Sequence, residues 1–404
     1  MVDTLAWIAV GISLVPAHRA ANQTSRALLL ALVTVEVVGV VLASIAVAST
    51  RTWTEIAQED GIIEWATFAA FMFAAGWLVL GVRRPSPSRW FTLARLLLAA
   101  FCVVVAGEEI SWGQRLLGFK PPDVFLELNF QQEANLHNVL MHEEGLGFKI
   151  ESKHLVIAIA VGFGLLWPLL VRTERFKGFA SLAPPLALAP LALGVVAAEL
   201  SYDVELTGEG AELVTGLLFL ASAVVETDRS PRLVVGWLAA PFIAAVVLST
   251  VVTRLMFGSD EQGVRTATAE LSILAGDLEA GATDKLLKRS VHKRVFTAVR
   301  DGYLRLSGSS YLEGRGTAAE PSALEVRTDR RGYFLDPWNN PYWISYDRRE
   351  QIGVIYSFGP NRRRDLVRGD PDNATGDDVI AHFELRARDR PSTPTPADHD
   401  REPR

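Results

Sequence analysis

Carboxylate, carboxamide and imidazole side chains gather in one stretch, Gly107–Glu144, directly after the apolar run Trp90–Ala106. The candidate catalytic residues there are Glu108, Glu109 and His137, and the other polar candidates are Gln114, Asn129, Gln132, Glu133, Asn135, Asn138 and His142. A loop that only joined two membrane spans would not need so many hydrogen-bonding groups among large apolar side chains. The composition therefore predicts a folded polar site at a membrane face.

The spacing inside this stretch indicates the chemistry it could support. Glu133 and His137 are four residues apart, and Asn138 and His142 have the same spacing. A helix over Glu133–Glu144 would place each pair on one face. Carboxylate and imidazole groups arranged in this way suit zinc, iron or manganese, and a glutamate beside them can act as a general base. The alternative is that the same groups are solvated loop charges, helix caps and partners of buried backbone atoms.

Composition excludes several classes of function. The chain has 404 residues, 49% of them hydrophobic, a formal net charge of −6 and one cysteine, Cys102. A single cysteine rules out an intramolecular disulfide and a multi-cysteine zinc site. The negative charge argues against a nucleic-acid partner. Glycine-rich phosphate loops and the GxSxG, HExxH and CxxCH motifs are missing from the sequence.

Apolar stretches before residue 258 are long enough to cross a membrane, which takes about 20 residues each. We predict an α-helical polytopic membrane bundle over residues 1–257 with about eight spans, or seven if the short first stretch does not cross. The expected spans are Leu5–Ala17, Ala27–Ser49, Ile62–Val82, Trp90–Gly107, His154–Val171, Leu182–Leu200, Ala211–Val225 and Leu233–Phe257. Pro184, Pro185 and Pro190 are expected to break or kink the sixth span.

The loops between these spans alternate in charge. Basic residues mark one side: Arg19, Arg26, Arg83, Arg84, Arg89, Arg172, Arg175, Lys177, Arg229 and Arg232. Acidic residues mark the other: Glu55, Glu59, Asp60, Glu108, Glu109, Asp203, Glu205 and Glu209. Because basic loops stay in the cytoplasm, we expect a plasma-membrane protein with both termini outside. Glu36, inside the second span, is expected to face a partner or a wet cavity.

The polar part of the chain after residue 257 predicts a small α+β domain over residues 258–385. A helix is expected over Ser259–Glu279, with Val264, Leu271, Leu274 and Leu278 forming its apolar stripe. Short strands are expected at Tyr333–Leu335, Tyr342–Tyr346 and Gly353–Ser357, separated by Pro, Asn and Gly. Residues 386–404, rich in Pro, Asp, Arg and Thr, predict a disordered tail.

Three segments of this domain, DPWNNPYWISY (Asp336–Tyr346), IGVIYSFGPN (Ile352–Asn361) and GDDVI (Gly376–Ile380), carry a family resemblance. Together they resemble the C-terminal domain of the major pseudopilin of type II secretion. The resemblance implies a helix packed on a small sheet, outside the cytoplasm. It also implies a calcium site that includes Asn361, Asp377 and Asp378. The basic run Arg362–Arg364 departs from the family pattern and leaves a plain solvated acidic loop as the alternative.

The pattern EExxWGQR…NxQxExNLHN over Glu108–Asn138 resembles bacterial polytopic membrane proteins and implies no activity. Two functions follow as expectations. The first is an envelope protein whose pseudopilin-like domain binds a protein partner or assembles, with calcium as its cofactor. The alternative is a membrane-embedded hydrolase or transferase that uses a transition metal or acid–base catalysis on a lipid-linked substrate. Membrane lipid is an expected partner in both cases, and nucleic acid in neither.

Overall fold

The computed structural model describes residues 2–48, 61–85, 87–129, 132–136, 139, 151–201, 207–227, 230–256, 260–313, 330–360 and 376–385. The predicted disordered tail, residues 386–404, lies outside this set. The chain divides into two compact units, Met1–Ser259 and Asp260–Arg404. Each unit has a hydrophobic core of its own.

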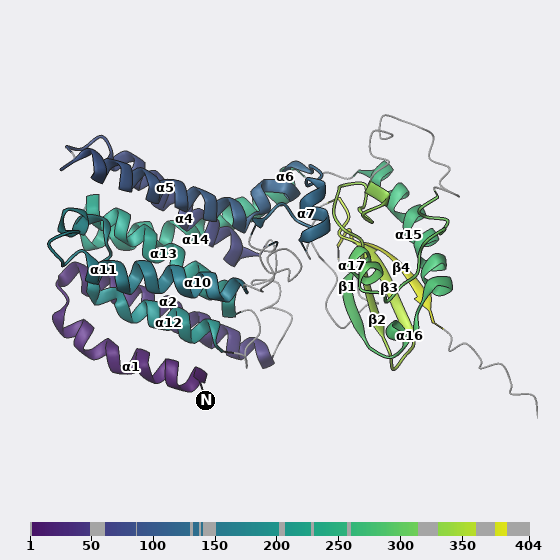
Figure 1. The fold of residues 1–404 in the computed structure, drawn as a ribbon, viewed down its shortest axis with the longest axis horizontal. Coiled ribbons are helices and arrows are strands. Elements are labelled where there is room, and N and C mark those ends of the chain that lie inside the picture. The colour runs from purple at the N-terminus through teal and green to yellow at the C-terminus, as the bar shows by residue number, and fades with distance from the viewer. Residues whose placement is uncertain are drawn as a thin grey trace, which may run out of the picture. The chain divides into compact units, whose positions relative to one another are not determined.

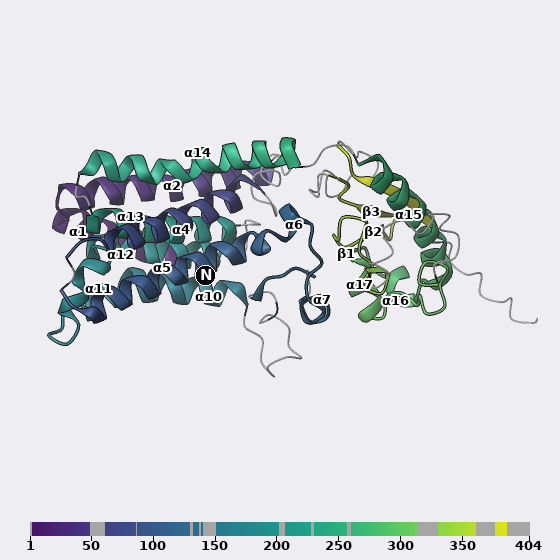
Figure 2. The same ribbon diagram turned by 90° about the horizontal axis from the view of Figure 1, so that it is seen from above.

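The first unit is a bundle of helices that lie alongside one another (Figures 1 and 2). Its helices are α1 (Val2–Ala20), α2 (Gln23–Ala48), α4 (Ile62–Gly81), α5 (Arg89–Glu109), α10 (Ser152–Val161), α11 (Trp167–Leu170), α12 (Ala189–Glu199), α13 (Thr207–Thr227) and α14 (Pro231–Met256). A π-helical segment, Gly162–Leu166, joins α10 to α11. Two short helices, α6 (Gln114–Leu117) and α7 (Asp123–Leu128), lie at the end of the bundle where α5 finishes (Figure 1).

Five helical stretches among the described residues are long and apolar enough to cross a membrane. They are Ile62–Gly81, Arg89–Glu109, Lys153–Leu170, Gly208–Glu226 and Pro231–Leu248. The prediction of apolar membrane helices is confirmed for these five. The predicted break in the sixth span is also present, because α12 begins only at Ala189, after Pro184 and Pro185.

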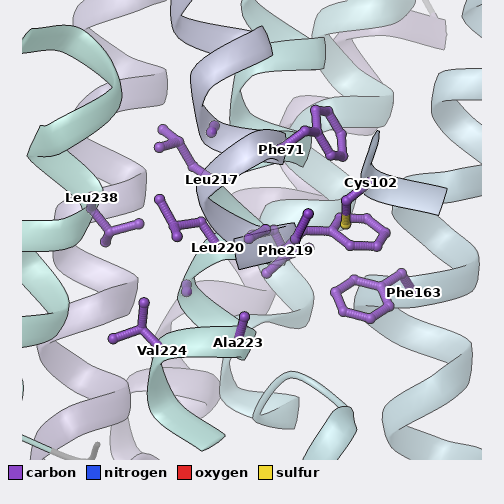
Figure 3. Close-up of a cluster of buried hydrophobic side chains, with 14 of the residues drawn as sticks. Phe71, Cys102, Phe163, Leu217, Phe219, Leu220, Ala223, Val224 and Leu238 are labelled. Atoms are coloured by element: carbon purple, nitrogen blue, oxygen red, sulfur yellow. The ribbon is translucent and has the colours of Figure 1, made fainter. Parts of the chain in front are cut away.

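Helix α13 is the centre of the bundle, and 72% of its apolar stretch is buried. Its Phe219 stacks on Phe163 with ring centroids 3.8 Å apart and also contacts Phe71 (Figure 3). The same ring stacks on Phe101 of α5. Gly216 of the same helix lies so close to Phe71 of α4 that a Cβ there would come within 3.1 Å of the ring. Close packing of small and aromatic residues holds membrane helices together because lipid removes most of the hydrophobic driving force between them.

A buried ion pair ties three helices together at the other end of α5. Arg95 of α5, 4% exposed, pairs with Glu226 of α13 and donates a hydrogen bond to the Gly81 carbonyl at the end of α4. Its guanidinium also lies over the Phe91 ring, 4.8 Å from the centroid. A charged group in a membrane helix is tolerated when it is paired inside the bundle. The sequence analysis treated this span as apolar and missed the pair.

The second unit is a helix packed on a four-stranded antiparallel sheet. Its elements are α15 (Glu261–Gly281), α16 (Asp284–Leu287), β1 (Val291–Arg294), α17 (Val295–Arg300), β2 (Trp343–Asp347), β3 (Ile352–Ser357) and β4 (Val379–Glu384). The strands follow one another in the order β1-β2-β3-β4, and α15 packs against β3 and β4. The prediction of a small helix-and-sheet unit is confirmed at this level. The predicted strand Tyr333–Leu335 is wrong: these residues form a turn, in which only Leu335 makes a bridge, to Pro341.

A buried carboxylate anchors α15 to the rest of this unit. Glu270, fully buried, accepts hydrogen bonds from both terminal nitrogens of Arg330 and, at 2.7 Å, from the Tyr342 hydroxyl. Arg330 also donates to the Leu335 carbonyl at 2.7 Å. Burial, and then the neighbouring charge of Glu270, raise the pKa of Tyr342 well above its ordinary value, so its hydroxyl stays protonated as a donor. The network links the helix to the turn before β2.

Replacing Glu270 by Gln removes the carboxylate that pairs directly with the buried Arg330 guanidinium. We expect the change to destabilise the second unit by about 3 kcal/mol or more, because an unpaired buried charge is costly. The matched control is Arg265→Ala, which breaks the exposed Arg265–Glu261 pair on the same helix and is expected to cost less than about 0.5 kcal/mol. Hydrogen exchange of the β2 and β3 amides in the full chain measures the loss of stability caused by each substitution. Equal effects of the two substitutions would contradict the account.

Candidate functional site

The loop after α5 begins with an unusual backbone turn. Ser111, Trp112 and Gly113 follow one another in the left-handed region, with φ of 46°, 54° and 75°. For residues other than glycine this conformation costs roughly 1–2 kcal/mol each, so the surroundings must impose it. The Trp112 ring lies against Gly107, where a Cβ would come within 2.9 Å of the ring. The glycine near the end of α5 thus makes room for the tryptophan.

Two side chains, one at the end of α5 and one near the start of the loop, accept hydrogen bonds from backbone amides further along it. Glu108 accepts a hydrogen bond from the Trp112 indole at 2.8 Å and another from the Leu136 amide at 2.5 Å. Gln114, 2% exposed, accepts a hydrogen bond from the Ala134 amide at 2.7 Å. Both contacts tie the segment 132–136 to the start of the loop.

A second group of side chains is buried, and its members form hydrogen bonds with one another. The Ser111 hydroxyl donates to Glu133 Oε2 at 2.9 Å, and Asn135 Nδ2 donates to the same oxygen at 3.1 Å. Asn129 Nδ2 donates to Asn135 Oδ1 at 2.8 Å and to the Glu133 carbonyl at 2.6 Å. Each of these four residues is at most 5% exposed. Gln132, fully buried, adopts a φ of 56° in the bend between them. We call Glu108, Ser111, Gln114, Asn129, Glu133 and Asn135 the loop network.

The predicted helix over Glu133–Glu144 is wrong at its start. Residues 133–135 form a bend, because their side chains and amides bond back to the Glu108–Gln114 segment. Glu133 therefore points into the loop network, where its carboxylate accepts from Ser111 and Asn135. His137, Asn138 and His142 lie outside the described residues, so the predicted metal-binding pairs stay predictions.

Carboxylates from three helix ends meet beside the loop network. Glu109 is the last residue of α5, Glu199 the last of α12, and Glu212 lies in the second turn of α13. The charge of Glu212 is close enough to those of Glu109 and Glu199 for repulsion, and Glu109 is also repelled by Glu209. The sequence analysis selected only Glu109 as a site residue, because spacing along the chain does not reveal which helix ends come together. Among the described residues, no group of three or more His, Cys, Asp or Glu is arranged to hold a metal ion.

Glu36, the acidic residue inside α2, lies against a neighbouring helix. Its carboxylate lies directly against Gly194 of α12, where any Cβ would overlap it. Its Oε1 atom is buried and, within the described part of the chain, has no hydrogen-bond partner. Because Gly194 has no side chain, the Glu36 carboxyl group fits between α2 and α12.

In the second unit, Asp336 organises the DPWNNPY turn. Its Oδ1 atom accepts hydrogen bonds from the Trp338 and Asn340 amides at 2.9 and 2.8 Å. Its Oδ2 atom accepts one from the Ser357 hydroxyl at 2.6 Å. Burial raises the pKa of Asp336 to about 6, and these hydrogen bonds oppose the rise. The turn is thus fixed to the end of β3 by one fully buried carboxyl group.

The predicted calcium ligands are described only in part. Asp377 and Asp378 lie just before β4, while Asn361 lies outside the described residues. Gly359 (φ 68°) packs so tightly against the Asp377 backbone that a Cβ would overlap the carbonyl oxygen. The segment after β3 and the segment before β4 are therefore in direct contact.

No protein-family model, no curated protein and no solved structure matches this chain. The resemblances to pseudopilins and to bacterial polytopic proteins stay predictions from the sequence motifs. The function is therefore inferred from the geometry of each unit.

Proposed function

We propose that this chain is a multi-pass plasma-membrane protein with about eight spans and an extracytoplasmic, pseudopilin-like domain that binds an envelope protein or assembles with its neighbours. The observation that carries the proposal is the loop network. Its carboxylates and carboxamides hydrogen-bond to one another and to backbone amides, so they serve to hold the loop. Catalytic groups, by contrast, have to face a substrate.

The distribution of charge along the bundle supports this orientation. Arg83 and Arg84 follow α4 and Arg89 begins α5, so all three lie at the end of α5 opposite to Glu109. Arg172 and Arg175 follow α11 and add to the basic side. Basic residues at a membrane face are retained in the cytoplasm, and this rule favours the proposed topology, with the loop network and the C-terminal domain outside. In the proposal the remaining three of the eight spans are α1, α2 and the stretch Leu182–Leu200, which includes α12.

Exposed apolar side chains support contact between the loop and membrane lipid. Trp112, Leu117, Val124 and Leu136 are between 46% and 70% exposed, and all belong to the loop or its short helices. Tryptophan is enriched at the interface between lipid and water. In the proposed arrangement α6 and α7 lie along the outer lipid surface with these side chains in it. Calcium bound through Asn361, Asp377 and Asp378 is part of the proposal because the pseudopilin resemblance implies it.

The carboxylates at the helix ends favour a second candidate, a membrane-embedded hydrolase or transferase acting on a lipid-linked substrate. Glu109, Glu199 and Glu212 lie together, and Glu199 Oε1 is buried with no hydrogen-bond partner in the described part of the chain. A desolvated carboxylate of this kind can serve as a general base. In this alternative Glu109 and His137 are central, with or without a transition metal, because Glu108 is occupied by Trp112 and Leu136.

Labelling of introduced cysteines tests the orientation. The native Cys102 is fully buried and should not react. A single cysteine is introduced at one of two exposed positions, Ser310 in the second unit or Pro87 between α4 and α5. Each variant then shows on which side of the membrane its position lies. Neither substitution removes a charge from the loops that set the orientation. We expect a membrane-impermeant maleimide to label Ser310→Cys in intact spheroplasts and Pro87→Cys only after lysis. The reverse pattern, or labelling of both from one side, would overturn the proposed topology.

Element analysis of the purified full-length protein separates the two candidate functions. The first predicts bound calcium that is lost on Asp378→Ala and kept on His137→Ala. A transition metal that is lost on His137→Ala and kept on Asp378→Ala would favour the enzyme instead. Glu174→Ala, an exposed surface change, is the control and should alter neither. Protein without calcium after dialysis against calcium buffer would remove the calcium part of the proposal.

A further inference from the structure

An open pocket of about 840 Å³ lies at one end of the sheet in the second unit. It is lined by Lys288, Arg289, Ser290, Arg348, Arg349 and Gln351. Four of these six residues are cationic and none is acidic. The sequence analysis did not select any of them, because the two groups are far apart in the chain.

Sheet pairing brings the two groups together. Val291, the first residue of β1, pairs with Tyr346 near the end of β2. The residues just before Val291 therefore lie beside the turn between β2 and β3. A hydrogen bond from the Arg348 amide to the Ser290 hydroxyl, 3.3 Å long, joins the two segments directly. The pocket, which we call the basic pocket, is thus built on a fixed strand register.

Local contacts fix the backbone conformation of the turn between β2 and β3, which carries Arg348 and Arg349. The Arg349 amide donates to Asp347 Oδ1 at 2.6 Å, and Gln351 adopts a left-handed φ of 58°. Short polar side chains that accept from an amide two residues on are typical of tight turns. Both arginines therefore project from an ordered turn.

The charges of the basic pocket are not neutralised within the described part of the chain. Lys288, Arg289, Arg348 and Arg349 are all exposed, and none of the four makes an ion pair with a described residue. Other basic residues of the same unit are paired: Arg265 with Glu261, Lys293 with Asp301 and Arg330 with Glu270. The acidic residues of the turn are Asp347, which accepts from the Arg349 amide, and the exposed Glu350. Four like charges held together in a chain of net charge −6 favour an anionic ligand.

We propose that the basic pocket binds a phosphate-bearing molecule. Arginine pairs with phosphate oxygens through two parallel N–H donors, and lysine adds a point charge. The volume exceeds that of a single phosphate and lies within the range of about 300–1,000 Å³ that small-molecule sites occupy, so a phosphate attached to a polar body fits. Two sources share this chemistry, the headgroup of an anionic membrane lipid and a soluble phosphorylated compound. The inference goes beyond the proposed function, because it needs neither a protein partner nor calcium.

The test uses the full-length protein in nanodiscs of phosphatidylcholine. Calorimetric titration with inorganic pyrophosphate probes the soluble source, and co-flotation with vesicles containing phosphatidylglycerol, against vesicles of phosphatidylcholine alone, probes the lipid source. We expect binding in at least one arm, weakened tenfold or more by Arg348→Gln/Arg349→Gln and by Lys288→Gln/Arg289→Gln. All four side chains are exposed, so these variants should keep the fold, and unchanged hydrogen exchange over β2 and β3 checks this.

The matched control is Arg265→Gln/Lys285→Gln, which removes the same number of charges from elsewhere in the unit and should leave binding within about twofold. Binding that the control weakens as much as the pocket variants do would mean a general charge effect and would overturn the proposal. Binding unaffected by the pocket variants, or no binding to pyrophosphate or to anionic vesicles, would overturn it too. Binding of vesicles alone would identify the lipid headgroup as the ligand, and binding of pyrophosphate alone a soluble phosphate compound.

Discussion

The need to satisfy buried polar groups at the end of a membrane bundle determines the conformation of the described part of the loop after α5. A backbone amide that is removed from water needs a hydrogen-bond acceptor, and an amide without one costs about 1–3 kcal/mol of folding free energy. Glu108 and Gln114 supply acceptors for Leu136 and Ala134. The left-handed turn at Ser111 and Trp112 is maintained because it brings the Ser111 hydroxyl to Glu133 and the Trp112 indole to Glu108. Glu108, Gln114 and Glu133, which the sequence presents as candidates for a catalytic or polar site, thus stabilise the conformation of the loop.

The same constraint acts at two other buried charges. Arg95 pairs with Glu226 between membrane helices, and Glu270 pairs with Arg330 inside the second unit. In both cases the arginine also donates a hydrogen bond to a backbone carbonyl, that of Gly81 for Arg95 and that of Leu335 for Arg330. Removal of one partner from such a pair is costly, which makes each pair a strong determinant of how its helices meet. The carboxylates Glu109, Glu199 and Glu212 differ, because like charges gather there, and they remain the groups in the bundle best suited to chemistry.

Much of the fold could be predicted from the sequence, because it depends on local composition. Apolar length identified the five confirmed spans, prolines located the break before α12, and short runs bounded by Pro, Asn and Gly located β2 and β3. Strand β1, VHKR, was missed because its polar composition carries little strand signal, and it forms through pairing with β2.

The candidate site was harder to predict, because it depends on contacts between distant residues. The sequence selected Gln114, Asn129, Glu133 and Asn135, and the structure brings them together with Ser111. Their roles could not be read from spacing. A four-residue interval suggested a helix that begins at Glu133, and hydrogen bonds of Glu133 and Ala134 to the Ser111–Gln114 segment bend the chain there instead. The meeting of Glu109 with Glu199 and Glu212, and that of Arg348 with Ser290, likewise depend on which helix ends and which strands become neighbours.

The central claim is that the loop network holds the loop closed, and hydrogen exchange of the segment 132–136 in nanodiscs tests it directly. In the unchanged protein the Ala134 and Leu136 amides should be protected. Gln114→Ala should raise exchange of Ala134 by roughly tenfold or more, because the lost acceptor is worth about 1–3 kcal/mol. Asp123→Asn, which breaks the Lys120–Asp123 pair at an exposed carboxylate in the same loop, should leave exchange unchanged. An unprotected segment, or equal exchange in Gln114→Ala and the unchanged protein, would contradict the account and return these residues to the list of candidates for catalysis.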